Sequence, residues 1–197
     1  MKQTFGPLVV GMDGWVEGGE VAHVPSPYFD ARPAHTPIDL LVIHSISLPP
    51  GEFGTGEPLR LFLGTLDLGA HPFYATLVGL QVSAHFLIER SGRITQFVSC
   101  AERAWHAGVS TFEGRARCND FSLGIELEGC DTVAFMPAQY EALVHLTQTL
   151  AAAYPLRAVC GHCHIAPERK TDPGPCFEWA RYERALQLPR LSFPVSA

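Results

Sequence analysis

Apolar runs separated by turn-forming residues dominate the chain, and their periodicity predicts strands that alternate with helices. Residues 38–47 (IDLLVIHSIS) carry a β-branched and leucine-rich run, which is typical of a buried central strand. Residues 82–98 (VSAHFLIERSGRITQFV) hold two apolar segments around a polar turn at Ser91 and Gly92, which predicts a hairpin. Residues 121–129 (FSLGIELEG) alternate between apolar and small or acidic positions, as expected of a strand with one buried face.

Helical periodicity is clearest between Pro137 and Pro155. Apolar residues recur there every three or four positions, so we predict a helix that begins at the first proline and stops before the second. Shorter helices are predicted at 59–68 (LRLFLGTLDL) and at 177–186. Because strands and helices interleave, we expect an α/β (α+β) fold with a mixed central β-sheet flanked by helices.

The length of the chain bounds its organisation. With 197 residues, 47% of them hydrophobic, it can form one domain with a full core. We expect this domain at 14–186, with a poorly ordered N-terminal extension at 1–13 and a C-terminal tail at 187–197. No apolar run is long enough for a transmembrane helix, and the apolar patch near the start is too short for a secretion signal. We therefore expect a cytoplasmic protein.

Charge and cysteine content narrow the function further. The net charge of −6, with histidine neutral, argues against a nucleic-acid-binding protein, which needs a basic face. Disulfides are one interpretation of an even cysteine count, but a chain with a full core in a reducing compartment needs none, so we expect free thiols. The six cysteines are Cys100, Cys118, Cys130, Cys160, Cys163 and Cys176.

The densest titratable segment is GHCHIAPERKTDPGP, residues 161–175, whose prolines exclude a long helix. Cys160 and Cys163 form a C-x-x-C there. A structural zinc site would need a second pair of ligands at matched spacing, and a redox motif would stand at the start of a helix. Neither condition is met in the sequence, so we expect neither role.

A different set of residues suits catalytic zinc. His162 and Asp172 lie on either side of the proline-stiffened loop, and with His44 they provide two imidazoles and one carboxylate, with a fourth position open. Lys170 would face the same side of an extended loop as Asp172 and could stabilise an oxyanion. For His44 taken alone, a core histidine bonded to the backbone is the other interpretation.

Glu126 is the candidate general base. It shares its strand face with the small residues Ser122 and Gly124, which leave room above the sheet for a cleft. An ordinary solvent-facing acid on a half-exposed strand would give the same pattern. These residues are compatible with a zinc hydrolase, but three ligands scattered along the chain do not form a dense motif.

Six stretches in order along the chain resemble one known family. Together they resemble the AmpD family of bacterial 1,6-anhydro-N-acetylmuramoyl-L-alanine amidases, part of the wider zinc amidase and peptidoglycan-recognition fold. The stretches are VPSPYFDARP (24–33), LLVIHSISLPPGEFG (40–54), VSAHFLI (82–88), RAWHAGVS (103–110), CNDFSLGIELEG (118–129) and GHCHIAPERKTDPGP (161–175).

The resemblance implies one Zn²⁺ ion in a surface groove, bound by His44, His162 and Asp172. It also implies that Glu126 is the general base and that Lys170 stabilises the oxyanion. The implied reaction is hydrolysis of the amide between the lactyl group of anhydro-N-acetylmuramic acid and L-Ala, during cell-wall recycling in the cytoplasm. The expected partners are anhydromuramoyl peptides, with neither nucleic acid nor membrane, and the expected state is a monomer.

Four residues are expected to contact the substrate: Trp105, His106, Arg117 and Ser45. Trp105 and His106 should line the groove, where an aromatic ring can stack on a sugar; for Trp105 a plain core position is the alternative. Arg117 resembles the family's anchor for a stem-peptide carboxylate. Ser45 and Gln81 stand where the family usually carries Asn and Arg, which predicts a weaker dependence on the third residue of the stem peptide.

Two other functions fit the same resemblance. A non-catalytic peptidoglycan sensor would typically have lost a metal ligand, whereas all three ligands are present here, together with Glu126 and Lys170. An amidase acting on periplasmic peptidoglycan would need an export signal, and none is visible in the sequence. The sequence therefore favours the cytoplasmic enzyme.

Overall fold

Two parallel strands, β5 and β11, lie side by side in the middle of a six-stranded mixed sheet. The computed structural model describes residues 6–19 and 21–194. The strand order is β12-β5-β11-β6-β7-β3, in which β6 and β7 are antiparallel and the other neighbours are parallel. The strands are β3 (Val21–His23), β5 (Leu40–Ile46), β6 (Phe86–Ile88), β7 (Ile94–Gln96), β11 (Ser122–Glu128) and β12 (Ala158–Gly161).

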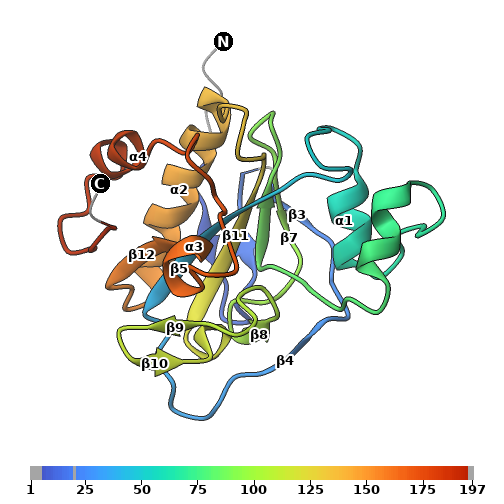
Figure 1. Cartoon of the computed structure of the whole chain (residues 1–197). Coiled ribbons are helices and arrows are strands. Elements are labelled where there is room, and N and C mark those ends of the chain that lie inside the picture. The colour runs from blue at the N-terminus through green and yellow to red at the C-terminus, as the bar shows by residue number, and fades with distance from the viewer. Residues whose placement is uncertain (1–5, 20, 195–197) are drawn as a thin grey trace.

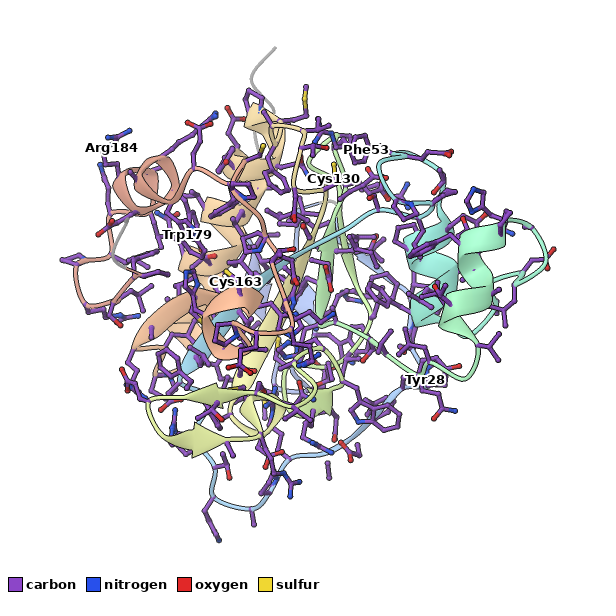
Figure 2. All side chains as sticks on the ribbon, in the orientation of Figure 1. Tyr28, Phe53, Cys130, Cys163, Trp179 and Arg184 are labelled. Carbon is purple, nitrogen blue, oxygen red and sulfur yellow. The ribbon has the colours of Figure 1, made fainter. Side chains whose placement is uncertain are left out.

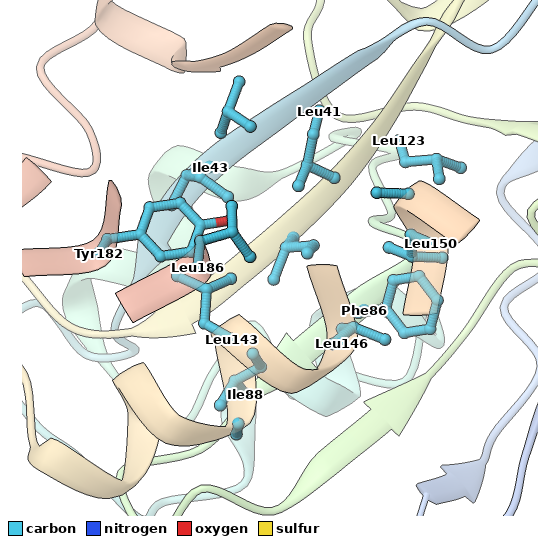
Figure 3. Packing of buried hydrophobic residues seen from close by; sticks show 14 of the residues in the cluster. Leu41, Ile43, Phe86, Ile88, Leu123, Leu143, Leu146, Leu150, Tyr182 and Leu186 are labelled. Carbon is cyan, nitrogen blue, oxygen red and sulfur yellow. The ribbon is translucent and has the colours of Figure 1, made fainter. Parts of the chain in front are cut away.

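Helices α2 (Pro137–Ala153) and α4 (Trp179–Leu186) cover one face of this sheet (Figure 1). Apolar side chains from both layers interdigitate in the main core, as Figure 3 shows. This packing removes apolar area from water and fixes which face of each strand points inward. The residues in contact include Leu41, Ile43, Leu123, Ile125, Leu143, Leu146, Leu150, Tyr182 and Leu186. The predicted central strand, hairpin, alternating strand and C-terminal helices are confirmed.

The helix predicted at 59–68 is shorter than expected. Helix α1 runs over Glu57–Phe62, and a 3₁₀ helix, η1, follows at Pro72–Leu77. The chain turns away at Gly64, whose φ of 68° favours glycine and where a Cβ would clash with the Tyr28 hydroxyl. These two helices form the part of the molecule farthest from α4 in Figure 1 and have their own apolar cluster.

The described residues near both ends of the chain, within 6–13 and 187–194, pack against the rest of the fold. Leu8 is buried in the main core, and β1 (Val9–Val10) pairs with β2 (Val16–Glu17), so the predicted poor order of the extension is wrong for residues 6–13. Residues 1–5 lie outside the described residues. Near the other end, Leu191 is buried and the backbone of Ser192 bonds to that of Val159. The domain boundaries themselves stay a prediction.

Smaller elements complete the fold around the sheet. Two further two-stranded sheets, β4-β8 and β9-β10, lie at the lower edge of the molecule in Figure 1. Among the described helices, none combines the length and apolarity that crossing a bilayer requires. The remaining elements are β4 (Phe29–Ala31), β8 (Glu102–Ala104), β9 (Thr111–Phe112), β10 (Arg115–Ala116), η2 (Cys118–Asp120) and α3 (His162–Ile165).

The cysteines are free thiols, as predicted, and they come from separate parts of the fold. Cys160 is buried in β12, whereas Cys163 is partly exposed in α3. Figure 2 shows Cys130 well apart from Cys163, on another segment. The C-x-x-C therefore forms no disulfide, in agreement with the interpretation of its sequence.

Candidate metal centre and active site

The register of the two central strands places the first site residues. His44 of β5 lies directly opposite Glu126 of β11. Since Ile43 and Ile125 point into the core under α2, their neighbours His44 and Glu126 point to the other face of the sheet. On the far side of β5, Gly161 ends β12 opposite Ile43, so that His162 follows at the same end of the sheet.

Three of these polar side chains converge on one point. The Nδ1 atom of His44 lies 3.1 Å from Nδ1 of His162 and 3.0 Å from Oδ2 of Asp172, and the last two atoms are 3.1 Å apart. Among the described residues, these three form the one group of His, Cys, Asp or Glu side chains with the geometry to hold a metal ion. The C-x-x-C cysteines are not part of it.

Hydrogen bonds to the outer ring nitrogens support a metal site. Nε2 of His162 lies 3.1 Å from the carbonyl oxygen of Ala107. Because a carbonyl oxygen can only accept, Nε2 carries the proton, and Nδ1 presents its lone pair to the other two groups. Nε2 of His44 is likewise bonded, at 2.9 Å, to Nδ1 of His106. Two imidazole lone pairs and a carboxylate oxygen facing one another are what a cation would bring together, so the donor set fits a metal.

The electrostatics of the three residues agree with this arrangement. Burial lowers the pKa of His44 to about 4, which leaves the imidazole neutral at pH 7, the form that ligates metals. For Asp172, burial alone would raise the pKa, but the adjacent rings of His162 and His44 outweigh it and hold the pKa well below its usual range. The carboxylate is therefore ionised at neutral pH.

Glu126 and Lys170 face the same groove, which has a volume of about 670 Å³ and is also lined by His162 and Asp172. Desolvation raises the pKa of Glu126 well above its usual range, and the charge of Asp172 adds to this, whereas Lys170 opposes it. The Oε2 atom of Glu126 is buried and has no hydrogen-bond partner among the described residues. A basic carboxylate oxygen is thus available to a molecule bound in the groove.

Trp105, Ser45 and Gln81 line the groove as well. The indole of Trp105 is partly exposed; its Nε1 donates to Oδ1 of Asp30 at 3.0 Å, and its ring stacks on Tyr28 with centroids 6.2 Å apart. Tyr28 is labelled on the lower right of Figure 2. One face of Trp105 is therefore supported by protein at the edge of the groove, which suits a platform for a sugar.

Two other predicted substrate contacts are placed differently. Arg117 is not among the residues that line the groove: its side chain is 70% exposed and pairs with Oδ2 of Asp120 at 3.2 Å. Its role as a carboxylate anchor stays a prediction. His106 borders the groove but is 8% exposed, and its ring occupies the space above Ser122 and Gly124 that the sequence suggested was open.

Asn119 and Arg32 support the site but were not found from the sequence. The side-chain oxygen of Asn119 accepts hydrogen bonds from the backbone N–H groups of His106 (3.2 Å) and Ala107 (2.8 Å). Arg32 is partly buried and donates to the carbonyl oxygens of Asn119 and Ser122. In the sequence, Arg32 stands in a short segment between Pro27 and Pro33, but no local pattern shows that its side chain reaches β11.

Comparison with known proteins identifies the family. The family model for N-acetylmuramoyl-L-alanine amidases matches residues 34–175. The 1,6-anhydro-N-acetylmuramyl-L-alanine amidase AmpD of Citrobacter freundii is 56% identical over 179 residues, covering 90% of this chain and 94% of that protein. The Escherichia coli AmpD is 56% identical over 171 residues, covering 86% and 92%. The chain belongs to the AmpD family of amidases.

Similarity to solved structures supports the same family. A crystal structure of an AmpD derivative has a TM-score of 0.85 and 54% identity, over 88% of this chain and 97% of that one. The amidase AmiD of E. coli, solved with anhydro-N-acetylmuramic acid-L-Ala-D-gamma-Glu-L-Lys, has a TM-score of 0.57 and 32% identity, over 90% and 65%. The predicted family and mixed-sheet fold are confirmed, and this AmpD-family chain is an amide hydrolase.

The metal site predicts the metal content of purified variants. The wild-type chain should carry one metal ion, and Asp172→Asn should lose most of it, because a neutral amide oxygen replaces the charged ligand. Elemental analysis after gel filtration measures this. The matched control is His35→Asn, which changes an exposed histidine with φ of 59°, a conformation that asparagine tolerates. Equal metal content in Asp172→Asn and wild type would contradict the assignment.

Proposed function

We propose that this chain is a zinc-dependent amidase that hydrolyses the amide between the lactyl group of 1,6-anhydro-N-acetylmuramic acid and L-Ala, as part of cell-wall recycling. The observation that carries the proposal is the grouping of His44 with His162 and Asp172, two residues that line one groove together with Glu126. The 56% identity to two proteins named for this activity supports the choice of substrate. A relative from Pseudomonas aeruginosa, 27% identical, was also solved with an anhydromuramic pentapeptide.

Zinc is the metal that we propose for the site. Two histidines and one carboxylate are the donor set of many catalytic zinc sites, in which a fourth position stays open. When bound, zinc supplies Lewis acidity, which polarises an amide carbonyl and makes water more acidic. Neither C-x-x-C cysteine belongs to the group, so a closed, thiolate-rich structural site is not favoured.

In the proposed mechanism, Glu126 transfers the proton and Lys170 stabilises the developing negative charge. Glu126, with its raised pKa and free Oε2, takes a proton from the attacking water as the new C–O bond forms. Lys170 donates a hydrogen bond to the carbonyl oxygen as negative charge develops there. Glu126 then returns the proton to the L-Ala nitrogen as the C–N bond breaks, which leaves a lactyl carboxylic acid and a free peptide amine. The acid then loses its remaining proton, which the amine takes up.

The groove is shaped for a ligand with a sugar and a peptide. Trp105 offers an aromatic face at one edge, and the polar side chains of Ser45 and Gln81 offer hydrogen bonds. An apolar wall is formed by Leu48, Leu61, Phe62, Phe73, Leu77 and Leu80. Since recycling handles soluble wall fragments, we propose that the enzyme works in the cytoplasm and that these fragments are its partners. We also propose that it is a monomer and binds neither nucleic acid nor membrane.

The direct test is hydrolysis of anhydromuramoyl-tripeptide by the zinc-loaded protein, followed by mass spectrometry. Wild type should release free tripeptide, and Glu126→Gln should lower kcat by about 10²–10⁴ because it removes the proton acceptor at nearly constant volume. Zinc content should be equal in the two proteins. Intact substrate with zinc-loaded wild type would reject the proposed function.

Lys170 gives a second prediction about the transition state. Lys170→Met should lower kcat by about 10²–10³ with little change in KM, because the ammonium interacts with charge that develops only during reaction. Lys170→Arg serves as the matched control, since it keeps the positive charge on a long side chain. A rise in KM at constant kcat would instead assign Lys170 to binding of the ground state.

Gln81 predicts the selectivity for the stem peptide. Because the side chain at this position in the groove is uncharged, exchange of diaminopimelate for lysine at the third stem residue should lower kcat/KM by less than about tenfold, or about 1.4 kcal/mol. The variant Gln81→Arg should increase this discrimination by adding a partner for the extra carboxylate. A loss greater than tenfold in wild type would contradict the prediction.

A further inference from the structure

We propose that His106 is a positioning residue for the metal ligand His44, rather than a residue that contacts the substrate. This inference rests on the proposed metal site. The two ring nitrogens of His106 are both engaged within the protein. Nδ1 lies 2.9 Å from Nε2 of His44, and Nε2 lies 3.2 Å from Oγ of Ser122. The imidazole therefore has no free polar atom to offer to a molecule in the groove.

The proton positions along this chain of hydrogen bonds follow from the ligand role of His44. If Nδ1 of His44 gives its lone pair to a metal, the proton of the neutral ring must be on Nε2. That N–H then donates to Nδ1 of His106, whose own proton is on Nε2 and points to the Ser122 hydroxyl. In this arrangement, each ring nitrogen of His44 and His106 has a partner. The hydrogen bond from Nε2 of His44 to His106 also fixes the plane of the His44 ring.

The ring of His106 packs directly against strand β11. The ring packs so closely over Gly124 that a Cβ at this position would lie 2.5 Å from Cγ of His106. It meets the His44 ring edge to face, with centroids 5.0 Å apart and an interplanar angle of 85°. The backbone N–H of His106 also donates a hydrogen bond to the side-chain oxygen of Asn119 at 3.2 Å. A larger residue at 124 would displace the ring, so the glycine is required by this contact.

The same short segment supports the second histidine ligand. The carbonyl oxygen of Ala107 accepts the bond from Nε2 of His162, one residue after the side chain that contacts His44. Asn119 also binds the N–H of Ala107, at 2.8 Å. One segment thus orients both imidazoles, His44 through a side chain and His162 through the backbone. Replacing the His106 side chain should therefore affect His44 and leave the bond to His162 in place.

The test compares His106→Leu with His106→Asn in zinc affinity, measured by competition with a chelator, and in the visible absorption of the Co²⁺-loaded protein. The leucine variant lacks the acceptor, so zinc affinity should fall by about 10–100-fold and the Co²⁺ bands should shift. The asparagine variant keeps an oxygen near the position of Nδ1 and should recover most of the affinity. Unchanged affinity and spectrum in a folded His106→Leu would overturn the proposal.

A matched control removes a buried hydrogen bond on the other face of the sheet. Tyr182→Phe deletes the 2.7 Å bond between the Tyr182 and Thr147 hydroxyl groups. It should lower stability without changing zinc affinity. A fall in zinc affinity equal to that of His106→Leu would show that general loosening, and not the lost acceptor, explains the effect, and would overturn the proposal.

A measurement on the zinc-loaded wild type avoids any folding defect. In ¹⁵N-histidine NMR, the protein should show His44 protonated at Nε2 and His106 protonated at Nε2 with Nδ1 unprotonated. A proton on Nδ1 of His106 would overturn the proposal. Since these readouts do not use turnover, absence of amidase activity with correct tautomers would reject the proposed function alone, whereas wrong tautomers in an active amidase would reject the positioning role alone.

Discussion

The mutual approach of His44, His162 and Asp172 is the interaction on which the rest of the site depends. Three ligand atoms lie within 3.1 Å of one another at a largely buried position, two of them nitrogen lone pairs and one a carboxylate oxygen. Electron-rich atoms pointed at each other away from water are unfavourable unless a cation holds them. We therefore propose that a bound metal ion is the reason for this geometry.

Parallel strands and the loop that follows α3 bring these side chains together. Parallel pairing of β5 with both β11 and β12 brings His44, Glu126 and His162 to one end of the sheet. The helices α2 and α4 occupy the opposite face, and on the site face the polar groups follow a small apolar cluster that includes Leu40 and Val42. The loop that follows α3 carries Asp172, and Arg169 ties this loop to the carbonyl oxygen of Val109 at 2.7 Å. Rigid elements thus hold each ligand before substrate arrives.

Much of this organisation could be predicted from the sequence, because periodicity is a local property. The alternation of 121–129 correctly separated the core face from the face of Glu126, and the prolines correctly bounded α2. The packing of the N-terminal segment was missed, because a two-residue strand carries almost no periodic signal. Residue chemistry alone suggested the set of His44, His162 and Asp172, but only the resemblance to a family made it specific, since no local rule links position 44 to positions 162 and 172.

The contact of His106 with His44 shows the limit of such predictions. The two residues are 62 positions apart, and the small residues of β11 were correctly identified as leaving space, but the sequence could not show what fills it. Arg117 illustrates the reverse case, in which a motif suggests a contact with the groove and the structure directs the side chain to Asp120. Long-range side-chain packing decides both, and it is not encoded in any short window.

X-ray absorption at the zinc edge of the purified protein tests the central claim most directly, because it reports the atoms bound to the metal. Zinc held by two histidines and one aspartate should show nitrogen and oxygen neighbours at about 2.0–2.2 Å, two of them with the outer-ring scattering of imidazole. Sulfur neighbours at about 2.3 Å would assign the zinc to the cysteines around the C-x-x-C instead. That result would contradict the assignment of His44, His162 and Asp172 as the metal centre.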